Sequence, residues 1–232
     1  MMIKSTELNL LDFCDIDQQS QYLADEVARL LTAKISTNGN ALLAVSGGST
    51  PKTMFNKLSY APIDWDKVTI TLIDDRWLPS SHQDSNQRLV EENLLINNAS
   101  AANFIPLFQS HETNANAPKQ LNALFSNENL ELDIALLGMG NDGHSASIFP
   151  CCEQIDEGLN TQATFLSTEP TTAPYSRITF SAHAINKAEH IFLQLKGDDK
   201  KITLEKALAD DDEKAMPIRR FLNKNTTVLW CP

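Results

Sequence analysis

A histidine and an aspartate stand two positions apart in a glycine-rich stretch, residues 138–150, with the sequence GMGNDGHSASIFP. Imidazole is the side chain best suited to proton exchange near neutral pH, and a neighbouring carboxylate can orient its ring. Glycines let the backbone approach a ligand closely. Asp142 and His144 are therefore candidates for general acid–base chemistry. The ordinary alternatives are an Asx turn for the aspartate and a capping or half-buried position for the histidine.

The glycines of this stretch, Gly138, Gly140 and Gly143, also spell G-x-G-x-x-G, the fingerprint of dinucleotide-binding proteins. That fingerprint requires a long helix directly after the third glycine, because the helix N-terminus holds the pyrophosphate. Pro150 follows Gly143 closely and disfavours a helix that runs through it. The sequence therefore argues against a dinucleotide site at this position.

A second candidate loop is SGGSTP at residues 46–51, which follows the apolar run ALLAV. Backbone N–H groups, hydroxyls and the positive end of a helix beginning near Pro51 together suit a phosphate. The ending of a Walker A loop is absent, and so is the G-x-S-x-G pattern of a nucleophile elbow. The candidates for phosphate binding are Ser46, Gly47, Gly48 and Ser49. The alternative is a tight turn in which Ser49 or Thr50 only caps the helix.

Further charged residues stand where predicted strands begin or end. Asp74 and Arg76 follow the apolar run 68–73, Arg177 precedes a short strand, and Lys200 lies in the first turn of a predicted helix. The cations are candidates for binding an anion, and Asp74 is a candidate for orienting the imidazole or contacting substrate hydroxyls. Ordinary surface charges and salt bridges are the alternative for each of them.

The elements that position these residues alternate between strand and helix along the chain. The expected strands are residues 41–45, 68–73, 132–137, 178–180, 191–195 and 227–230, and the expected helices are residues 17–36, 85–96, 113–125 and 198–208. Residues 74–84 read as a polar loop, and residues 150–176 as the longest irregular stretch. The alternation predicts an α/β fold with a mostly parallel sheet covered on both faces, in one domain of residues 1–232. Ligands of such sheets bind beyond the carboxyl ends of the strands, so the candidate loops are expected to share one crevice.

Composition narrows the class of partner. The net charge is −11 and 42% of the residues are hydrophobic, which favours a folded chain and argues against nucleic acid, whose phosphates need a cationic surface. No apolar run reaches the length of a membrane span. The four cysteines form no C-x-x-C pair, which predicts a reduced, cytoplasmic protein without a zinc or redox motif. The first residues do not resemble a secretory signal, and the true start is either Met1 or Met2.

Taken together, these motifs resemble the 6-phosphogluconolactonases of the glucosamine/galactosamine-6-phosphate isomerase superfamily. The matching pieces are residues 46–51, residues 74–79 with Ser85-Asn86, residues 138–150, Arg177, Gly197-x-x-Lys200 and the closing segment 216–230. The resemblance implies a modified Rossmann-like fold and hydrolysis of 6-phosphogluconolactone in the oxidative pentose phosphate pathway, with no metal or organic cofactor. It also implies that His144 activates water and that Arg76 and Lys200 bind the phosphate. Glycine N–H groups near Gly140 are candidates for stabilising the oxyanion.

Two other functions stay open as alternatives. Glucosamine-6-phosphate deaminases share the glycine-rich loop and the Asp-Gly-His motif, but they typically carry an acid in a Phe-Asn-Glu segment after it. Here no acid follows until Glu153. A non-catalytic sugar-phosphate sensor usually adds a DNA-binding segment, for which this chain has neither the room nor the charge. One departure from the lactonase pattern is Asp75, where the family commonly has glutamate. The sequence predicts no oligomeric state.

Overall fold

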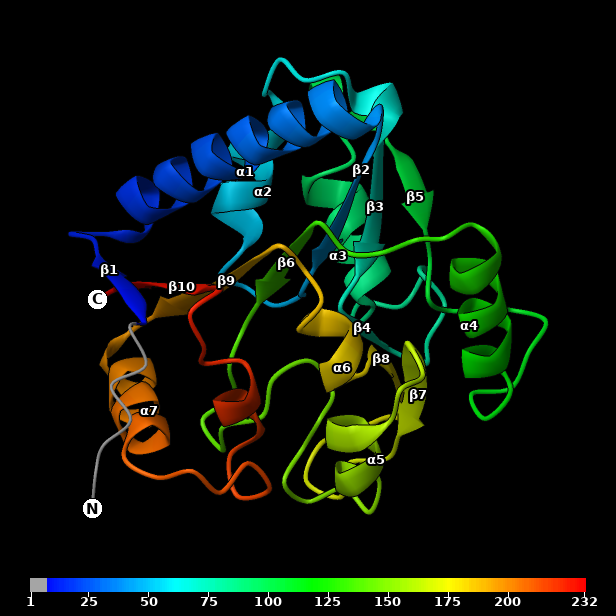
Figure 1. The fold of residues 1–232 in the computed structure, drawn as a ribbon, viewed down its shortest axis with the longest axis vertical. Coiled ribbons are helices and arrows are strands. Elements are labelled where there is room, and N and C mark those ends of the chain that lie inside the picture. Colours follow the sequence, from blue (N-terminus) through cyan, green and yellow to red (C-terminus); the bar gives the residue numbers. More distant parts are fainter. Residues whose placement is uncertain (1–7) are drawn as a thin grey trace.

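A parallel β-sheet forms the centre of the molecule in the computed structural model, which describes residues 8–232 (Figure 1). The sheet has seven strands in the order β1-β10-β9-β6-β2-β3-β5, and every neighbouring pair is parallel. The strands are β1 (Asn9–Asp12), β2 (Ala41–Val45), β3 (Val68–Leu72), β5 (Asn103–Ile105), β6 (Ile134–Leu137), β9 (His190–Lys196) and β10 (Thr226–Cys231). The central strands β2 and β6 are buried along their whole length, as expected for a parallel sheet covered on both faces.

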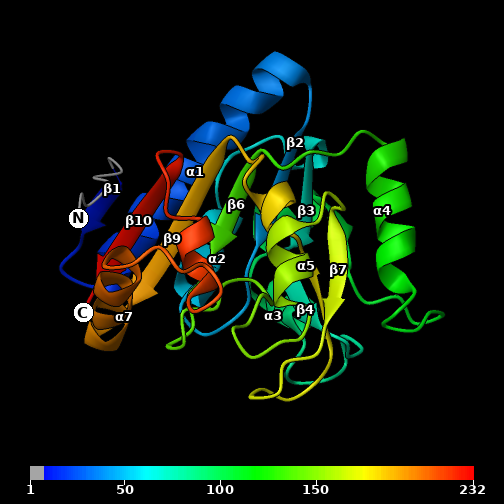
Figure 2. The ribbon, with the colours of Figure 1, turned by 60° about the horizontal axis from the view of Figure 1, so that its bottom comes forward.

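Helices cover both faces of this sheet. Figure 2 shows α1 and α2 behind the large sheet and α5 and α7 in front of it. The helices are α1 (Ile16–Asn38), α2 (Lys52–Ser59), α3 (Asn86–Asn93), α4 (Ala117–Asn127), α5 (Ile155–Asn160), α6 (Ala182–Ile185) and α7 (Asp198–Leu208), with short 3-10 turns η1 (Trp65–Lys67), η2 (Asn97–Ala101) and η3 (Pro217–Arg220). The predicted α/β class is therefore confirmed. Within residues 8–232, no helix combines the length and apolarity needed to cross a membrane.

The order of the strands creates a switch point between β2 and β6. From β2 the chain moves to β3 and β5 on one side, and from β6 it moves to β9 and β10 on the other side. Where connections leave neighbouring strands in opposite directions, a crevice opens beyond their carboxyl ends. The loops that follow β2 and β6 are residues 46–51 and 138–150, so the two strongest motifs of the sequence meet at this crevice.

A second, smaller sheet corrects two predictions. It contains β4 (Asp74–Arg76), β8 (Arg177–Phe180) and β7 (Phe165–Thr168), paired antiparallel in the order β4-β8-β7. Residues 74–84 therefore begin with a strand and are not wholly a loop, and residues 150–176 contain both α5 and β7. The polar residues of β4 give no strand signal of their own, because their backbone partners come from β8, about a hundred residues later in the chain.

The remaining differences concern edges and short elements. The edge strands β1 and β5, and the four-residue helix α6, were not predicted, because such short segments give little periodic signal. Helix α3 begins at Asn86 with Ser85 as its cap but ends before Ile96, and α4 runs four residues later than expected at its start. The prediction for the first residues and the choice between Met1 and Met2 lie outside the described residues.

Candidate active site

One cavity of about 570 Å³ opens at the carboxyl edge of the large sheet, over the switch point. Its lining includes nearly all the residues singled out in the sequence: Ser46, Gly47, Gly48, Ser49, Asp74, Arg76, His144, Arg177 and Lys200. The expectation that the candidate loops share one crevice is thus confirmed. Asp142 does not line the cavity and contacts it through His144 instead.

The loop after β2 leaves its hydrogen-bond donors free. Among the residues that the structure describes, no acceptor takes a hydrogen bond from the backbone N–H of Gly47, Gly48, Ser49 or Thr50. The Oγ atom of Ser46 is buried and likewise unpaired. Helix α2 has Pro51 as its N-cap residue with no side-chain cap, so the prediction that Ser49 or Thr50 caps the helix is wrong. Unpaired donors beside a helix N-terminus form a binding place for an anion.

Glycine is required at position 47 by its neighbour. A Cβ atom built there would lie 1.8 Å from Oδ1 of Asn86, whose side chain is packed directly against the loop. Asn86 is almost fully buried, and its Nδ2 atom donates to the backbone oxygen of Asp74 at 2.9 Å. Asn86 therefore connects the loop after β2 to strand β4. The sequence motif contained this residue but gave no reason for its role.

Asp75 is an internal anchor for helix α3 and does not contact the cavity. Its carboxylate accepts hydrogen bonds from the N–H groups of Asn86 at 2.7 Å and Gln87 at 3.0 Å, and from the Ser85 hydroxyl at 3.3 Å. The side chain is fully buried. Burial raises the pKa of the Asp75 carboxyl from 3.8 to about 6, and the N–H donors oppose that rise. This acid thus fixes the start of α3, and with it Asn86.

We expect Asp75 to contribute less to stability as the pH rises through 6. Because its pKa is higher in the folded chain than in the unfolded chain, the folded state keeps a proton that the unfolded state has already lost. Its contribution is fully present below the unfolded pKa, and between about pH 5 and pH 7 it falls by about 1 kcal/mol. Urea unfolding of wild type and Asp75→Asn at both pH values measures this change. A free-energy difference between the two proteins that is independent of pH would contradict it.

The turn after β6 places His144 beside Asp142. The Nδ1 atom of His144 lies 2.6 Å from Oδ1 of Asp142, and the backbone N–H of His144 donates to the same oxygen at 3.1 Å. Because a carboxylate only accepts, this contact requires a proton on Nδ1, and in the neutral ring the lone pair is then on Nε2. Burial disfavours the Asp142 charge, but hydrogen bonds from the His144 ring and N–H outweigh it and hold the pKa of Asp142 below its usual value. Of the two acids that could orient the imidazole, the geometry selects Asp142.

Two further contacts fix the histidine ring. It stacks on Phe149, with 4.0 Å between ring centroids, and a Cβ atom on Gly140 would lie 2.2 Å from it. The N–H of Gly140 donates to the backbone oxygen of His144 at 2.9 Å, so this one group is engaged in the turn, and stabilisation of an oxyanion by glycine N–H groups near Gly140 stays a prediction. After Gly143 the chain forms a turn and an isolated bridge, and the next helix begins only at Ile155. The rejection of a dinucleotide site is consistent with this geometry.

Asp74 is held by a different partner. Its Oδ2 atom accepts a hydrogen bond from Oγ of Ser147 at 2.5 Å, and both residues are buried. The backbone N–H of Ser147 in turn donates to Oγ1 of Thr179. Asp74 lines the cavity, its carboxylate is held there by Ser147, and no hydrogen bond joins it to His144 among the residues that the structure describes.

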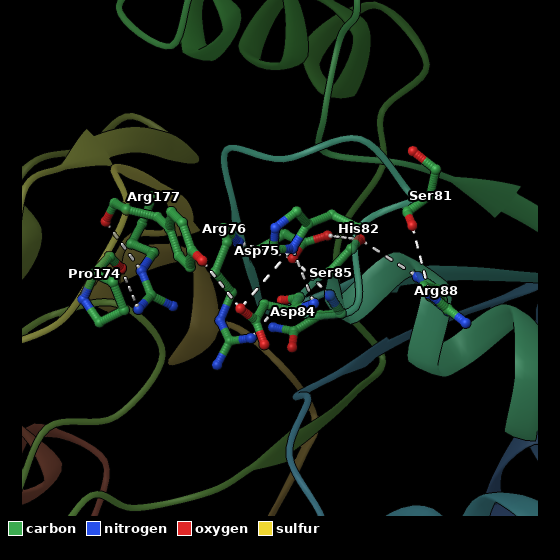
Figure 3. A network of polar contacts seen from close by, with 11 residues as sticks. Asp75, Arg76, Ser81, His82, Asp84, Ser85, Arg88, Pro174 and Arg177 are labelled. Atoms are coloured by element: carbon green, nitrogen blue, oxygen red, sulfur yellow. Dashed lines mark hydrogen bonds and ion pairs between the residues drawn. The ribbon is translucent and has the colours of Figure 1, made fainter.

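The cations of the cavity are not paired with carboxylates. Within residues 8–232, Arg76, Arg177 and Lys200 form no ion pair with a carboxylate. Neutral acceptors hold them instead. Arg76 donates to the backbone oxygen of Asp84, Arg177 donates to the backbone oxygens of Pro174 at 2.9 Å and Tyr175 at 3.3 Å, and Lys200 donates to Oδ1 of Asn141 (Figure 3 shows the arginines).

The two arginines also stand opposite each other. Arg76 and Arg177 are direct partners across β4 and β8, a like-charge pair that destabilises a sheet unless an anion lies nearby. Burial lowers the pKa of Arg177, and the Asp74 carboxylate opposes that change. The Nε atom of Arg76 is buried without a partner. In a chain with a net charge of −11, this concentration of cations without an ion-pair partner is suited to an anionic ligand.

Among residues 8–232, no group of three or more His, Cys, Asp or Glu side chains is placed to hold a metal ion.

Several residues of the cavity gave no functional signal in the sequence. Asp84 and Tyr175 come from irregular segments, and Phe149 reads as an ordinary part of the glycine-rich stretch. The same holds for Ser147, which lies outside the cavity lining but holds Asp74.

The fold and the cavity define an α/β protein with a cavity at the switch point of a parallel sheet. Residues 15–230 match the family model described as "Glucosamine-6-phosphate isomerases/6-phosphogluconolactonase". The chain therefore belongs to this family. It is 40% identical to a 6-phosphogluconolactonase of Rhizobium meliloti, over 92% of this chain and 94% of that protein. It is 38% identical to one of Pseudomonas aeruginosa, over 93% and 91%.

A solved structure of a 6-phosphogluconolactonase is also similar to this chain. The crystal structure of a 6-phosphogluconolactonase from Shewanella baltica matches with a TM-score of 0.95 and 41% identity, and the match covers 100% of both chains.

Proposed function

We propose that this chain hydrolyses 6-phospho-D-glucono-1,5-lactone to 6-phospho-D-gluconate in the oxidative pentose phosphate pathway. One observation carries the proposal: a histidine with a free Nε2 atom lines the same cavity as three cations that no carboxylate neutralises. A lactone that carries a phosphate group has the two parts that such a cavity accommodates: an uncharged ester for the histidine and an anion for the cations. The 6-phosphogluconolactonases similar to this chain over nearly its whole length support the same substrate.

In the proposed mechanism, His144 is the general base. Its Nε2 atom takes a proton from water while the water oxygen bonds to C1 of the lactone, and Asp142 stabilises the imidazolium that forms. The tetrahedral intermediate then breaks its bond from C1 to the ring oxygen, which receives the proton. A lactone is an activated ester, so this route needs no covalent nucleophile. It gives the carboxylic acid, which ionises.

The phosphate is the proposed anchor of the substrate. The free N–H groups at residues 47–50, the Ser46 hydroxyl and the Nε atom of Arg76 supply donors, and Lys200 and Arg177 add charge. Binding energy gained at the phosphate positions C1 against His144, although the phosphate itself does not react. Asp74, held by Ser147, is proposed to accept hydrogen bonds from the sugar hydroxyls.

The proposal also covers the domain organisation of the enzyme and its location in the cell. Strand β1 near the N-terminus pairs with β10 near the C-terminus, which supports one domain for the whole chain. The four cysteines carry no disulfide in the structure, which fits a reduced cytoplasmic location.

A direct comparison of two reactions tests the proposal. Purified protein is assayed for acid release from freshly prepared 6-phosphogluconolactone, above the spontaneous rate, and in parallel for ammonia release from glucosamine 6-phosphate. We expect rapid hydrolysis and no ammonia. Ammonia release without hydrolysis would assign the deaminase activity, and binding of sugar phosphates with neither reaction would assign a sensor.

A methyl group at Gly140 is expected to disturb the base without touching the phosphate site. Because a Cβ atom there would lie 2.2 Å from the His144 ring and 2.6 Å from Oδ1 of Asp142, both side chains must move. We expect Gly140→Ala to lower kcat about tenfold with little change in KM, because a small displacement of a catalytic group is costly. Gly39→Ala is the control for a destabilising methyl group far from the site: its Cβ would meet no atom, but the φ of 84° at the end of α1 strains alanine, so this variant should lose stability and keep kcat. An unchanged kcat in Gly140→Ala would argue against the base.

A further inference from the structure

The carboxylate of Asp84 lies beside Arg76 without pairing with it. Arg76 donates to the backbone oxygen of Asp84, so the guanidinium is held at this residue, but no ion pair within 4.0 Å joins it to the Asp84 carboxylate (Figure 3). The carboxylate points to a different partner, the hydroxyl of Tyr175, which donates to Oδ2 at 3.1 Å. Within residues 8–232, no other hydrogen bond reaches this carboxylate. A rotation of the Asp84 side chain would bring opposite charges together and neutralise Arg76.

Tyr175 is itself held in an unusual conformation. Its φ angle is 72°, in the left-handed region that residues other than glycine rarely adopt. The guanidinium of Arg177 donates to the backbone oxygens of Pro174 and Tyr175, and the N–H of Trp77 donates to the backbone oxygen of Ser176. A strained residue persists where its surroundings fix it, and such residues gather at functional sites. The segment before β8 is therefore fastened from two sides.

His82, in the loop after β4, contacts both Tyr175 and Asp84. Its ring meets the Tyr175 ring edge-on, with centroids 5.7 Å apart, and its Nδ1 atom accepts a hydrogen bond from the backbone N–H of Asp84 at 3.1 Å. The same Nδ1 atom lies 3.9 Å from Oδ2 of Asp84, which is beyond hydrogen-bonding distance. Tyr175 is thus the group that determines where the Asp84 carboxylate points.

We propose that Tyr175 is a positioning residue that holds the Asp84 carboxylate away from Arg76, so that the Arg76 guanidinium stays available for the substrate phosphate. The inference rests on the proposed function. It explains how the Arg76 guanidinium stays free of an ion pair although it is hydrogen-bonded to the backbone of an aspartate. Tyr175 acts through Asp84, and removal of its hydroxyl would release a competing anion into the phosphate site.

The test is a double-mutant cycle of Tyr175→Phe and Asp84→Asn. The phenylalanine variant keeps the ring but loses the donor, so the freed carboxylate pairs with Arg76 and competes with substrate. We expect its KM for the phosphorylated lactone to rise about threefold to fivefold at unchanged kcat, the factor that an exposed ion pair supplies. On the Asp84→Asn background, where no such ion pair forms, the same change should alter KM less than about 1.5-fold.

Controls separate this inference from its alternatives. Tyr60→Phe removes a hydroxyl from an exposed tyrosine, 60% accessible and outside the cavity, and should leave KM unchanged. Unphosphorylated glucono-1,5-lactone should not distinguish Tyr175→Phe from wild type. An equal rise of KM on both backgrounds would overturn the inference, because the hydroxyl would then contact substrate directly, and so would no rise at all.

Binding of inorganic phosphate, measured by calorimetry across the same four proteins of the cycle, gives a readout that does not depend on hydrolysis. We expect Tyr175→Phe to weaken phosphate binding by the same factor as KM, and only when Asp84 is present. Absence of lactone hydrolysis in the wild type would refute the proposed function alone. Phosphate binding that is equal in wild type and Tyr175→Phe would refute the positioning role alone.

Discussion

His144→Ala is expected to lower kcat for 6-phosphogluconolactone about a thousandfold, the usual contribution of general acid–base catalysis. The variant removes the Nε2 atom that accepts the proton of water, while the phosphate donors at residues 47–50 and Arg76 stay in place. KM should therefore change little. Steady-state kinetics against the spontaneous rate of hydrolysis gives both values, and thermal unfolding checks that the fold is retained.

A second histidine serves as the matched control. His111 is exposed, lies outside the cavity and should tolerate alanine without loss of activity. Turnover near the wild-type value in His144→Ala would refute the role of general base. A large rise in KM at constant kcat would instead assign His144 to substrate binding.

Arg76→Ala is expected to reduce kcat/KM for the phosphorylated lactone about thirtyfold to a hundredfold, mainly through KM, because a charge-assisted hydrogen bond is lost. The Nε atom that the structure leaves buried and unpaired is the donor concerned. With unphosphorylated glucono-1,5-lactone the same variant should lose much less. The ratio of the two losses measures how far Arg76 acts on the phosphate.

Arg88→Ala is the control for loss of a nearby positive charge. Arg88 lies on α3 close to the same network, but it pairs with Glu92 at 2.7 Å and does not line the cavity (Figure 3). Its replacement should change kcat/KM less than about twofold. Equal losses for both substrates in Arg76→Ala would mean that Arg76 supports the loop at Asp84 and does not bind phosphate.

The fold could be predicted where elements are apolar and continuous. The strands at 41–45 and 191–195 and the helices at 17–36 and 198–208 each carry their own pattern, and the structure places elements there within a few residues. Strand β4 could not be predicted in this way, because its residues, Asp-Asp-Arg, form a strand only when paired with β8. The strand β7 inside residues 150–176 depends on the same sheet.

The candidate site, like the fold, has a part that the sequence predicts and a part that depends on tertiary contacts. The sequence alone determined which chemical groups are present and in which loops they stand: a histidine beside an aspartate between glycines, a glycine pair before a helix, and an arginine after a strand. These are local properties, fixed by residue type and spacing, and a position after an apolar strand predicts the carboxyl edge of a parallel sheet.

Only the tertiary structure decided which groups act on one another. It selected Asp142 over Asp74 as the partner of His144, assigned Asp75 to the start of α3 and the Gly140 N–H to the turn itself, and set Tyr175 against Asp84. These contacts join residues from separate elements or depend on the conformation of a turn, and their energies depend on burial and distance. Residue order along the chain does not contain those quantities. The sequence therefore shows which charged groups are present, and the fold determines which of them stay unpaired in the cavity.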